Sequence, residues 1–224
     1  MVSNKKIYGK DYFEKQLTGV GTFSNRDLRR NTNWFLAQLR YFSNHFDVNF
    51  DEADNILEIG CAIAGIAHIF DSKGVSACAL DISSYAIKKA KKLSPRVSFK
   101  VSDIQKKIPF KDKFDFIFAF EVLEHLDNPL KSLKNIKRRL KKGGRLIVTT
   151  PYPFKRYIEI NTHVNVLHPR KWLSLMKKAG FKKIKFQPVT FLPRLYQWHN
   201  LLGIIFPINS NLPMINSTVF YVAE

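Results

Sequence analysis

Residues 55–65 decide the fold, and they read Asn-Ile-Leu-Glu-Ile-Gly-Cys-Ala-Ile-Ala-Gly. A compact apolar run leads into a cluster of small residues, and the stretch Ile66 to Phe70 then suits a helix. In the order strand, tight turn, helix, a ligand lies against the main chain at the positive end of the helix. We therefore expect this stretch to hold a nucleoside.

A carboxylate further along the chain supports this expectation. Asp81 closes a second apolar run, Ala77 to Leu80. An acid about twenty residues after the turn accepts hydrogen bonds from both hydroxyls of a ribose. The turn Gly60–Gly65 can be read as a dinucleotide-binding turn with alanine at the second glycine. With Glu58 in front, it instead resembles the first motif of the class I S-adenosylmethionine (SAM) methyltransferases.

Strands and helices alternate from residue 55 onward. The alternation predicts an α/β fold, a doubly wound, Rossmann-like and mostly parallel sheet of seven strands with helices on both faces. Ligands of such sheets collect at the carboxyl ends of the strands, where Glu58, Asp81, Asp103 and Glu121 are expected. The expected strands are about 55–60, 76–81, 97–101, 114–121, 145–150, 181–189 and 217–223, and the helices are about 64–73, 84–93, 129–142 and 169–179.

Two segments flank this core. Residues 1–50 are expected to form an N-terminal helical cap, because apolar residues recur at helical spacing from Asn25 to Phe46. The cap either packs on the sheet or acts as a lid, with Tyr8 or Tyr12 closing over the ligand. The apolar segment 190–216, within a domain spanning 51–224, either covers the acceptor site or dips into a membrane surface.

Charge and composition restrict the partners. The net charge is +19, and residues 131–185 hold seventeen Lys or Arg with the single acid Glu159. Such a surface attracts RNA or anionic lipid, unless it is only a solvated lysine-rich face. Two cysteines, Cys61 and Cys78, make no disulfide framework, so we expect a cytoplasmic protein. No stretch is apolar and long enough to cross a bilayer, so we expect no transmembrane segment.

The stretch 114–126 reads Phe-Asp-Phe-Ile-Phe-Ala-Phe-Glu-Val-Leu-Glu-His-Leu, and 142–151 reads Lys-Gly-Gly-Arg-Leu-Ile-Val-Thr-Thr-Pro. With Glu58 and the turn that follows it, the chain resembles the type 11 group of class I SAM-dependent methyltransferases, closely over 55–151 and loosely over 160–185. A nicotinamide enzyme is not expected to carry the Glu-Val-Leu-Glu-His element. The resemblance therefore implies that 51–224 is a SAM-binding methyltransferase domain.

The resemblance also implies roles for particular residues. Glu58 and the turn would hold the methionine portion of SAM, and Asp81 the ribose. Asp103 would accept from the adenine amino group. The implied cofactor-binding residues are Glu58, Gly60, Cys61, Ala62, Asp81, Ile82, Asp103, Ile104, Phe120 and Glu121.

Two acids and two histidines form a further candidate site. In a helical turn at 121–125, Glu121 and Glu124 would share a face with His125 beside them, and His163 would arrive from the connection after the fifth strand. Such a set suits a divalent metal such as Mg²⁺. It resembles the arrangement in small-RNA 2′-O-methyltransferases and quinone-biosynthesis O-methyltransferases. In the alternative, His125 is a lone base or a packed side chain.

Together these observations predict a SAM-dependent methyltransferase, directed to oxygen, that acts on a small hydroxylated or lipid-like acceptor. His125 or His163 would remove the acceptor's proton. One alternative is an RNA methyltransferase that uses the basic 131–185 face. Another is a SAM-binding protein without catalysis, because Ala62 and Ala64 replace the second and third glycines usual in the turn.

Overall fold

The computed structural model describes residues 7–16, 22–192, 195–212 and 216–224. It contains two compact units. The first unit comprises Met1–Asp103 and Arg194–Gly203, and the second comprises Ile104–Pro193 and Ile204–Glu224.

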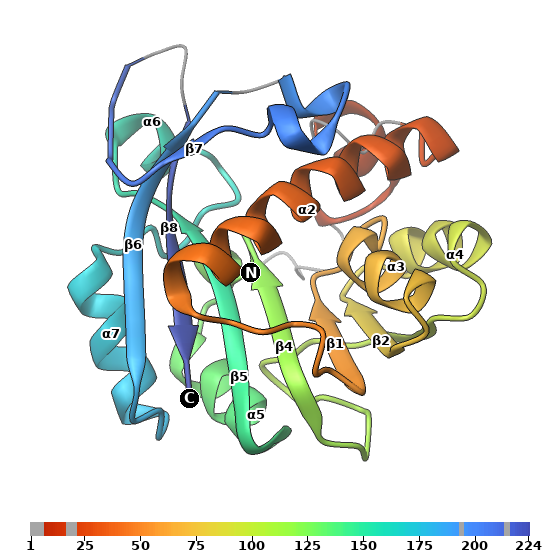
Figure 1. Cartoon of the computed structure of the whole chain (residues 1–224), viewed down its shortest axis with the longest axis horizontal. Helices are drawn as coiled ribbons and strands as arrows, with labels where there is room; N and C mark the ends of the chain where they lie inside the picture. Colours follow the sequence, from red (N-terminus) through yellow and green to blue (C-terminus); the bar gives the residue numbers. More distant parts are fainter. Residues whose placement is uncertain (1–6, 17–21, 193–194, 213–215) are drawn as a thin grey trace. The chain divides into compact units, whose positions relative to one another are not determined.

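Three parallel strands form the sheet of the first unit (Figure 1). Its order is β3-β2-β1, with β1 at Asn55–Ile59, β2 at Ser76–Asp81 and β3 at Ser98–Val101. All but the first residue of β1 and of β2 are buried, as expected for strands covered on both faces. The helices α3, Gly65–Ser72, and α4, Ser84–Leu93, connect these strands, so the turn after β1 opens at their carboxyl ends.

The long helix α2 begins and ends where the periodicity predicts, at Asn25 and Phe46. A capping box starts it: the backbone N–H of Asp27 donates to Ser24 Oγ, and the Asp27 carboxylate accepts from the Ser24 N–H at 2.9 Å. Its apolar stripe packs on α3 within the first unit. Before it lies a short π-helical turn, η1, at Tyr12–Gln16.

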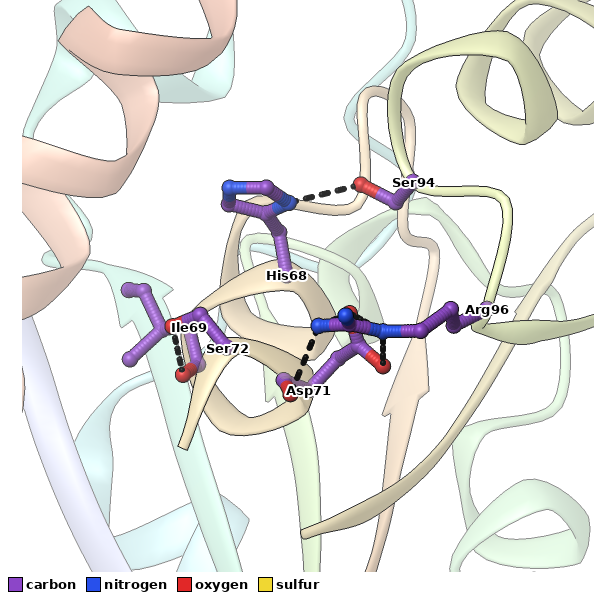
Figure 2. Close-up of polar contacts among 6 residues, drawn as sticks. All are labelled: His68, Ile69, Asp71, Ser72, Ser94 and Arg96. Atoms are coloured by element: carbon purple, nitrogen blue, oxygen red, sulfur yellow. Dashed lines mark hydrogen bonds and ion pairs between the residues drawn. The ribbon is translucent and has the colours of Figure 1, made fainter. Parts of the chain in front are cut away.

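Polar contacts fix α3 against the connection from α4 to β3 (Figure 2). The Arg96 guanidinium donates to both carboxylate oxygens of Asp71, and His68 Nδ1 lies 2.9 Å from Ser94 Oγ. Arg96 is largely exposed, so solvent screens this ion pair and it adds little to stability. It orients the helix more than it stabilises the unit.

The second unit has five strands in the order β4-β5-β8-β6-β7. β4 and β5 are parallel, whereas β8, β6 and β7 add antiparallel pairs. Helices α5 and α7 pack on each other, and Trp172 of α7 is fully buried. The strands are β4 Phe114–Phe120, β5 Leu140–Pro151, β6 Ile184–Phe191, β7 Ile205–Phe206 and β8 Asn216–Ala223, and the helices are η2 Leu123–His125, α5 Pro129–Lys137, α6 Lys155–Ile158 and α7 Pro169–Lys178.

The doubly wound, Rossmann-like α/β fold is confirmed, but the described residues form eight strands where seven were predicted. The additional strand is the two-residue β7, which pairs with the end of β6. The helix expected over 129–142 is also too long. It ends at Lys137, and β5 begins at Leu140 with a bulge in which Gly143 takes a φ of 77°.

The segment 190–216 divides between the units, apart from 193–194 and 213–215, which lie outside the described residues. In the first unit its short turns η3, Leu195–Gln197, and η4, Asn200–Leu202, pack on α2. The rings of Trp34 and Tyr196 lie 4.8 Å apart, and Arg40 donates to the carbonyl of Asn200 at 3.2 Å. No described helix is both long enough and apolar enough to cross a membrane.

Candidate functional site

The turn after β1 has an unusual backbone. Gly60, Ala62 and Ala64 all have positive φ, at 64°, 44° and 62°. An alanine in the left-handed region costs about 1–2 kcal/mol, because its Cβ approaches the following carbonyl oxygen. Strain of this kind persists where the surrounding structure requires it, often at functional sites. The turn therefore keeps the glycine-like shape although two of its positions are alanine.

Glu58 lies beneath this turn and is 4% exposed. Its Oε2 accepts from the backbone N–H of Ala67 in the first turn of α3, at 2.8 Å. Burial raises the pKa of Glu58 to about 8, and the nearby charge of Asp81 also acts to raise it. The carboxyl group thus holds the start of α3, and its predicted contact with the methionine portion of SAM stays a prediction.

Asp81 joins the end of β2 to the same turn. Its Oδ2 accepts from the Ala62 N–H at 3.0 Å, and its Oδ1 accepts from the Ser83 N–H at 2.8 Å. Burial raises the pKa of Asp81. The Ser102 N–H donates to the Asp81 carbonyl at 2.9 Å, which brings Asp103 to the same edge of the sheet. The first unit therefore places the acids at 58, 81 and 103 at neighbouring strand ends.

Aromatic side chains from the N-terminal segment pack against the turn. Ile63 belongs to a buried cluster with Phe13 and Phe23, and Tyr8 and Tyr12 lie against that cluster. Tyr85 of α4 packs there too and donates its hydroxyl to Glu14. The sequence alone did not identify Tyr85 as a candidate site residue. Its aromatic side chain, four positions after Asp81, could have indicated that it packs beside the turn. The lid hypothesis for Tyr8 and Tyr12 stays a prediction.

In the second unit, β4 ends at Phe120, and Glu121 follows it directly. Glu121 has a φ of 53°, and its N–H donates to the Thr149 carbonyl at 3.0 Å. Its Oε1 accepts from the hydroxyl of Thr218 at 2.9 Å, a partner 97 residues away that the sequence did not suggest. Ile104 is buried, and its carbonyl accepts from Asn135 Nδ2 at 2.8 Å.

Glu124, His125 and His163 form a three-residue group whose ligand atoms all lie within 4.8 Å of one another. His163 arrives from the connection after β5, and its ring centroid lies 4.9 Å from that of His125. Glu121 does not belong to this group. Because its φ is positive, it does not continue the helical turn of η2, so the expected shared face of Glu121 and Glu124 does not form.

Both imidazoles are held in one tautomer. Nδ1 of His125 lies 2.7 Å from the Thr162 carbonyl, and Nδ1 of His163 lies 2.7 Å from the Tyr157 carbonyl. A carbonyl only accepts, so Nδ1 carries the proton and Nε2 of each neutral ring carries a lone pair. Burial lowers the pKa of His125 to about 4 and also lowers the pKa of His163, so both rings are neutral at physiological pH.

Glu124 completes the group with an unusual carboxyl. The side chain is fully buried, and among the described residues neither of its oxygens has a hydrogen-bond partner. His125 Nε2 lies 3.8 Å from Glu124 Oε1. Burial, together with the charge of Glu121, raises the pKa of Glu124 well above its ordinary value. A buried carboxyl without partners beside two oriented imidazoles fits a divalent cation.

A hollow of about 480 Å³ also lies in the first unit, lined by α2, the loop 47–51 and α3. None of the predicted site residues lines it. The candidate site is therefore assigned from the strand ends and not from this hollow.

Comparison with known proteins places the chain in a family. The sequence profile of a family described as a methyltransferase domain matches residues 24–185. An uncharacterized protein of Methanocaldococcus jannaschii is 32% identical over 146 residues, which cover 60% of this chain and 68% of that protein. A ubiquinone biosynthesis O-methyltransferase of Candida albicans is 30% identical over 109 residues, which cover 45% of this chain and 33% of that enzyme.

A SAM-dependent methyltransferase from Archaeoglobus fulgidus shows the same fold, with a TM-score of 0.61 at 19% identity over 90% of this chain and 95% of that one. The profile match covers most of the chain, from α2 to the start of β6. The chain therefore belongs to the methyltransferase-domain family and is a SAM-dependent methyltransferase.

Proposed function

We propose that this enzyme transfers a methyl group to oxygen on a small, hydroxylated, lipid-like acceptor. The observation that carries the proposal is the oriented, neutral His125, whose Nε2 lone pair is suited to accept a hydroxyl proton. The ubiquinone biosynthesis O-methyltransferase among the relatives supports an oxygen acceptor.

The cofactor SAM supplies an activated methyl group on a sulfonium. In the proposal, Asp81 binds the ribose, Asp103 the adenine, and the strained turn presents its backbone to the methionine portion. Phe120 and Glu121 of the second unit stay predicted cofactor-binding residues. The protein's contribution is then mostly the positioning of two reactants, which is worth up to about 7–11 kcal/mol in well-oriented systems.

As a second role, exclusive of proton transfer by His125, we assign the group Glu124, His125 and His163 as the holder of a divalent cation such as Mg²⁺, because the single Nε2 lone pair of His125 either binds a cation or accepts a proton. Among the residues that the structure describes, none forms a hydrogen bond with the Glu124 carboxylate oxygens, which supports this assignment. When bound, the ion would polarise the acceptor hydroxyl and make it a better nucleophile. The residues' own part is to keep both rings oriented and the Glu124 oxygens out of water.

Methyl transfer from labelled SAM to a panel of catechols, phenols and prenylated phenols tests this proposal. We expect His125→Ala to lower kcat at least about a hundredfold with unchanged SAM affinity, as for the loss of a general base. His168→Ala is the control, because His168 is exposed and does not belong to the group Glu124, His125 and His163. Equal activity of both variants would refute the assigned base.

A separate experiment tests whether Glu124, His125 and His163 bind a metal ion. Isothermal titration with MgCl₂ should give saturable heat for the wild type and none for Glu124→Gln, with MnCl₂ as a second probe. Heat that persists in Glu124→Gln would exclude this group as the binding site.

An RNA acceptor remains the alternative that the basic 131–185 face predicts. RNA methylation should fall steeply with added salt, whereas turnover of a small acceptor should not. The expected compartment is the cytoplasm, in which Cys61 and Cys78 stay reduced, and both are free thiols in the structure.

A further inference from the structure

Large apolar side chains are exposed on two segments of the second unit. Single exposed apolar residues are normal, but a cluster of them marks an interaction surface. One segment runs from the last residue of α6 to residue 164, and the other runs from just before β7 to residue 212. We call these residues the apolar rim: Ile158, Ile160, Val164, Ile204, Phe206, Ile208 and Leu212, which are 41–63% exposed.

One hydrogen bond joins the two segments of the apolar rim, and another attaches one of them to the sheet. Arg156 of α6 donates from Nη1 to the Leu212 carbonyl at 2.8 Å. Thr190 of β6 donates to the Ile208 carbonyl at 2.7 Å, which attaches the other segment to the sheet. Figure 1 shows α6 near β7 and the loop that follows it. The rim is therefore a fixed part of the second unit.

The same segment also builds the histidine group. His163 Nδ1 donates to the carbonyl of Tyr157, and the Val164 N–H donates to the Glu124 carbonyl at 2.8 Å. One stretch of chain, 157–164, therefore carries both kinds of residue. Its side chains Ile158, Ile160 and Val164 belong to the apolar rim, and its backbone helps to position the histidine group. A surface that the rim contacts is consequently close to the proposed acceptor chemistry.

Charge indicates what the rim contacts. The second unit carries the seventeen Lys or Arg of residues 131–185 against Glu159 alone. Lys155 and Arg170 are exposed on the rim's own segment or just after it, and Lys155 forms an exposed ion pair with Glu159 at 3.7 Å. Apolar side chains combined with cations are the signature of binding to the interface of an anionic bilayer. A second copy of this chain, equally basic, would meet electrostatic repulsion.

We infer that the apolar rim inserts into the surface of an anionic membrane. The second unit docks there with its apolar side chains below the headgroups and its Lys and Arg near the lipid phosphates. The consequence that a lipid-like acceptor enters directly from the bilayer rests on the proposed function; the docking itself does not.

Flotation of the full chain with vesicles tests the inference. We expect binding to vesicles of phosphatidylcholine and phosphatidylglycerol, weaker binding to phosphatidylcholine alone, and loss of binding at high salt. Ile208→Glu/Leu212→Glu should weaken binding at least about tenfold, since two apolar side chains that would leave water on docking are replaced by charged ones. Val101→Glu is the control, because Val101 is an exposed apolar residue of the first unit and lies outside the apolar rim.

The inference would be overturned if the wild-type protein did not bind anionic vesicles. It would also be overturned if the double variant Ile208→Glu/Leu212→Glu bound them as tightly as the wild type. A dimer in sedimentation that the same double variant dissociates would overturn it as well, because the rim would then join two copies. Thermal unfolding checks that the double variant folds. Its SAM-binding heat and its transfer to a water-soluble acceptor should match the wild type, so a failure of the proposed function is seen separately from a failure of docking.

Discussion

The carboxylate of Asp81 accepts a hydrogen bond from the backbone N–H of Ala62 at 3.0 Å. This contact joins the carboxyl end of β2 to the strained turn after β1, so the two parts of the proposed adenosyl site are built as one element. The second oxygen of Asp81 accepts from Ser83 at the start of α4. A change in any of these residues should therefore affect both stability and cofactor binding.

Glu58 should make stability depend on pH. Its folded-state pKa, about 8, lies above the ordinary value of 4.5, so the folded protein holds the proton more tightly. The resulting stability is complete below about pH 4.5 and is lost as the pH rises through about 8, at no more than about 1.4 kcal/mol per pH unit. Urea unfolding from about pH 5 to about pH 8 measures this loss.

Glu58→Gln is the comparison for that experiment, because the amide still offers an oxygen to the Ala67 N–H without a charge. As the pH rises, the free energy of unfolding of the variant should increase relative to that of the wild type. Parallel profiles for the two proteins would show that Glu58 does not titrate in this range.

Ala62→Gly should stabilise the protein by about 1 kcal/mol, because glycine adopts a φ of 44° without the Cβ conflict. Thermal and urea unfolding measure the effect. Ala90→Gly is the control: it removes the same methyl group within α4 and should destabilise by about 1 kcal/mol or more. If Ala62→Gly destabilises as much as Ala90→Gly, the left-handed backbone at 62 is not a source of strain.

Gly65→Ala should destabilise the first unit by about 1–3 kcal/mol through overpacking. A Cβ at this position would overlap with Asn31 Oδ1 and lie 2.8 Å from Phe35 Cδ2, both on α2. In a double-mutant cycle, Asn31→Ala should recover part of the loss, since it removes the nearer obstacle. Strictly additive effects would mean that α2 and α3 do not meet as described.

Much of the fold was predictable because its signals are local. The helix Asn25–Phe46 and the strand Ser76–Asp81 have the predicted bounds, because the spacing of apolar residues and the capping residues are local features of the sequence. The strand β7 and the early start of β5 were missed for a different reason. β7 exists only through pairing with β6, and the bulge at Gly143 only through pairing with β4.

The site divides in the same way. Acids at the carboxyl ends of parallel strands follow from topology, so the positions of Glu58, Asp81 and Asp103 at one edge were foreseeable. The approach of His163 to His125 was expected, but the carbonyls that orient both rings come from the irregular stretch 152–168, which carries no periodic signal. The contact of Glu121 with Thr218 depends on β8, far along the chain, and no local pattern indicates it.

Calorimetric titration with S-adenosylhomocysteine, the product form of the cofactor, tests the central claim most directly. The account predicts saturable heat at one site for the wild type and for the control Asp112→Ala, whose side chain is exposed. Asp81→Ala should bind about ten- to a hundredfold more weakly, because a hydrogen bond to a charged group contributes about 1.5–3 kcal/mol. Absence of heat with the wild type, or equal affinity of Asp81→Ala and Asp112→Ala, would contradict the account.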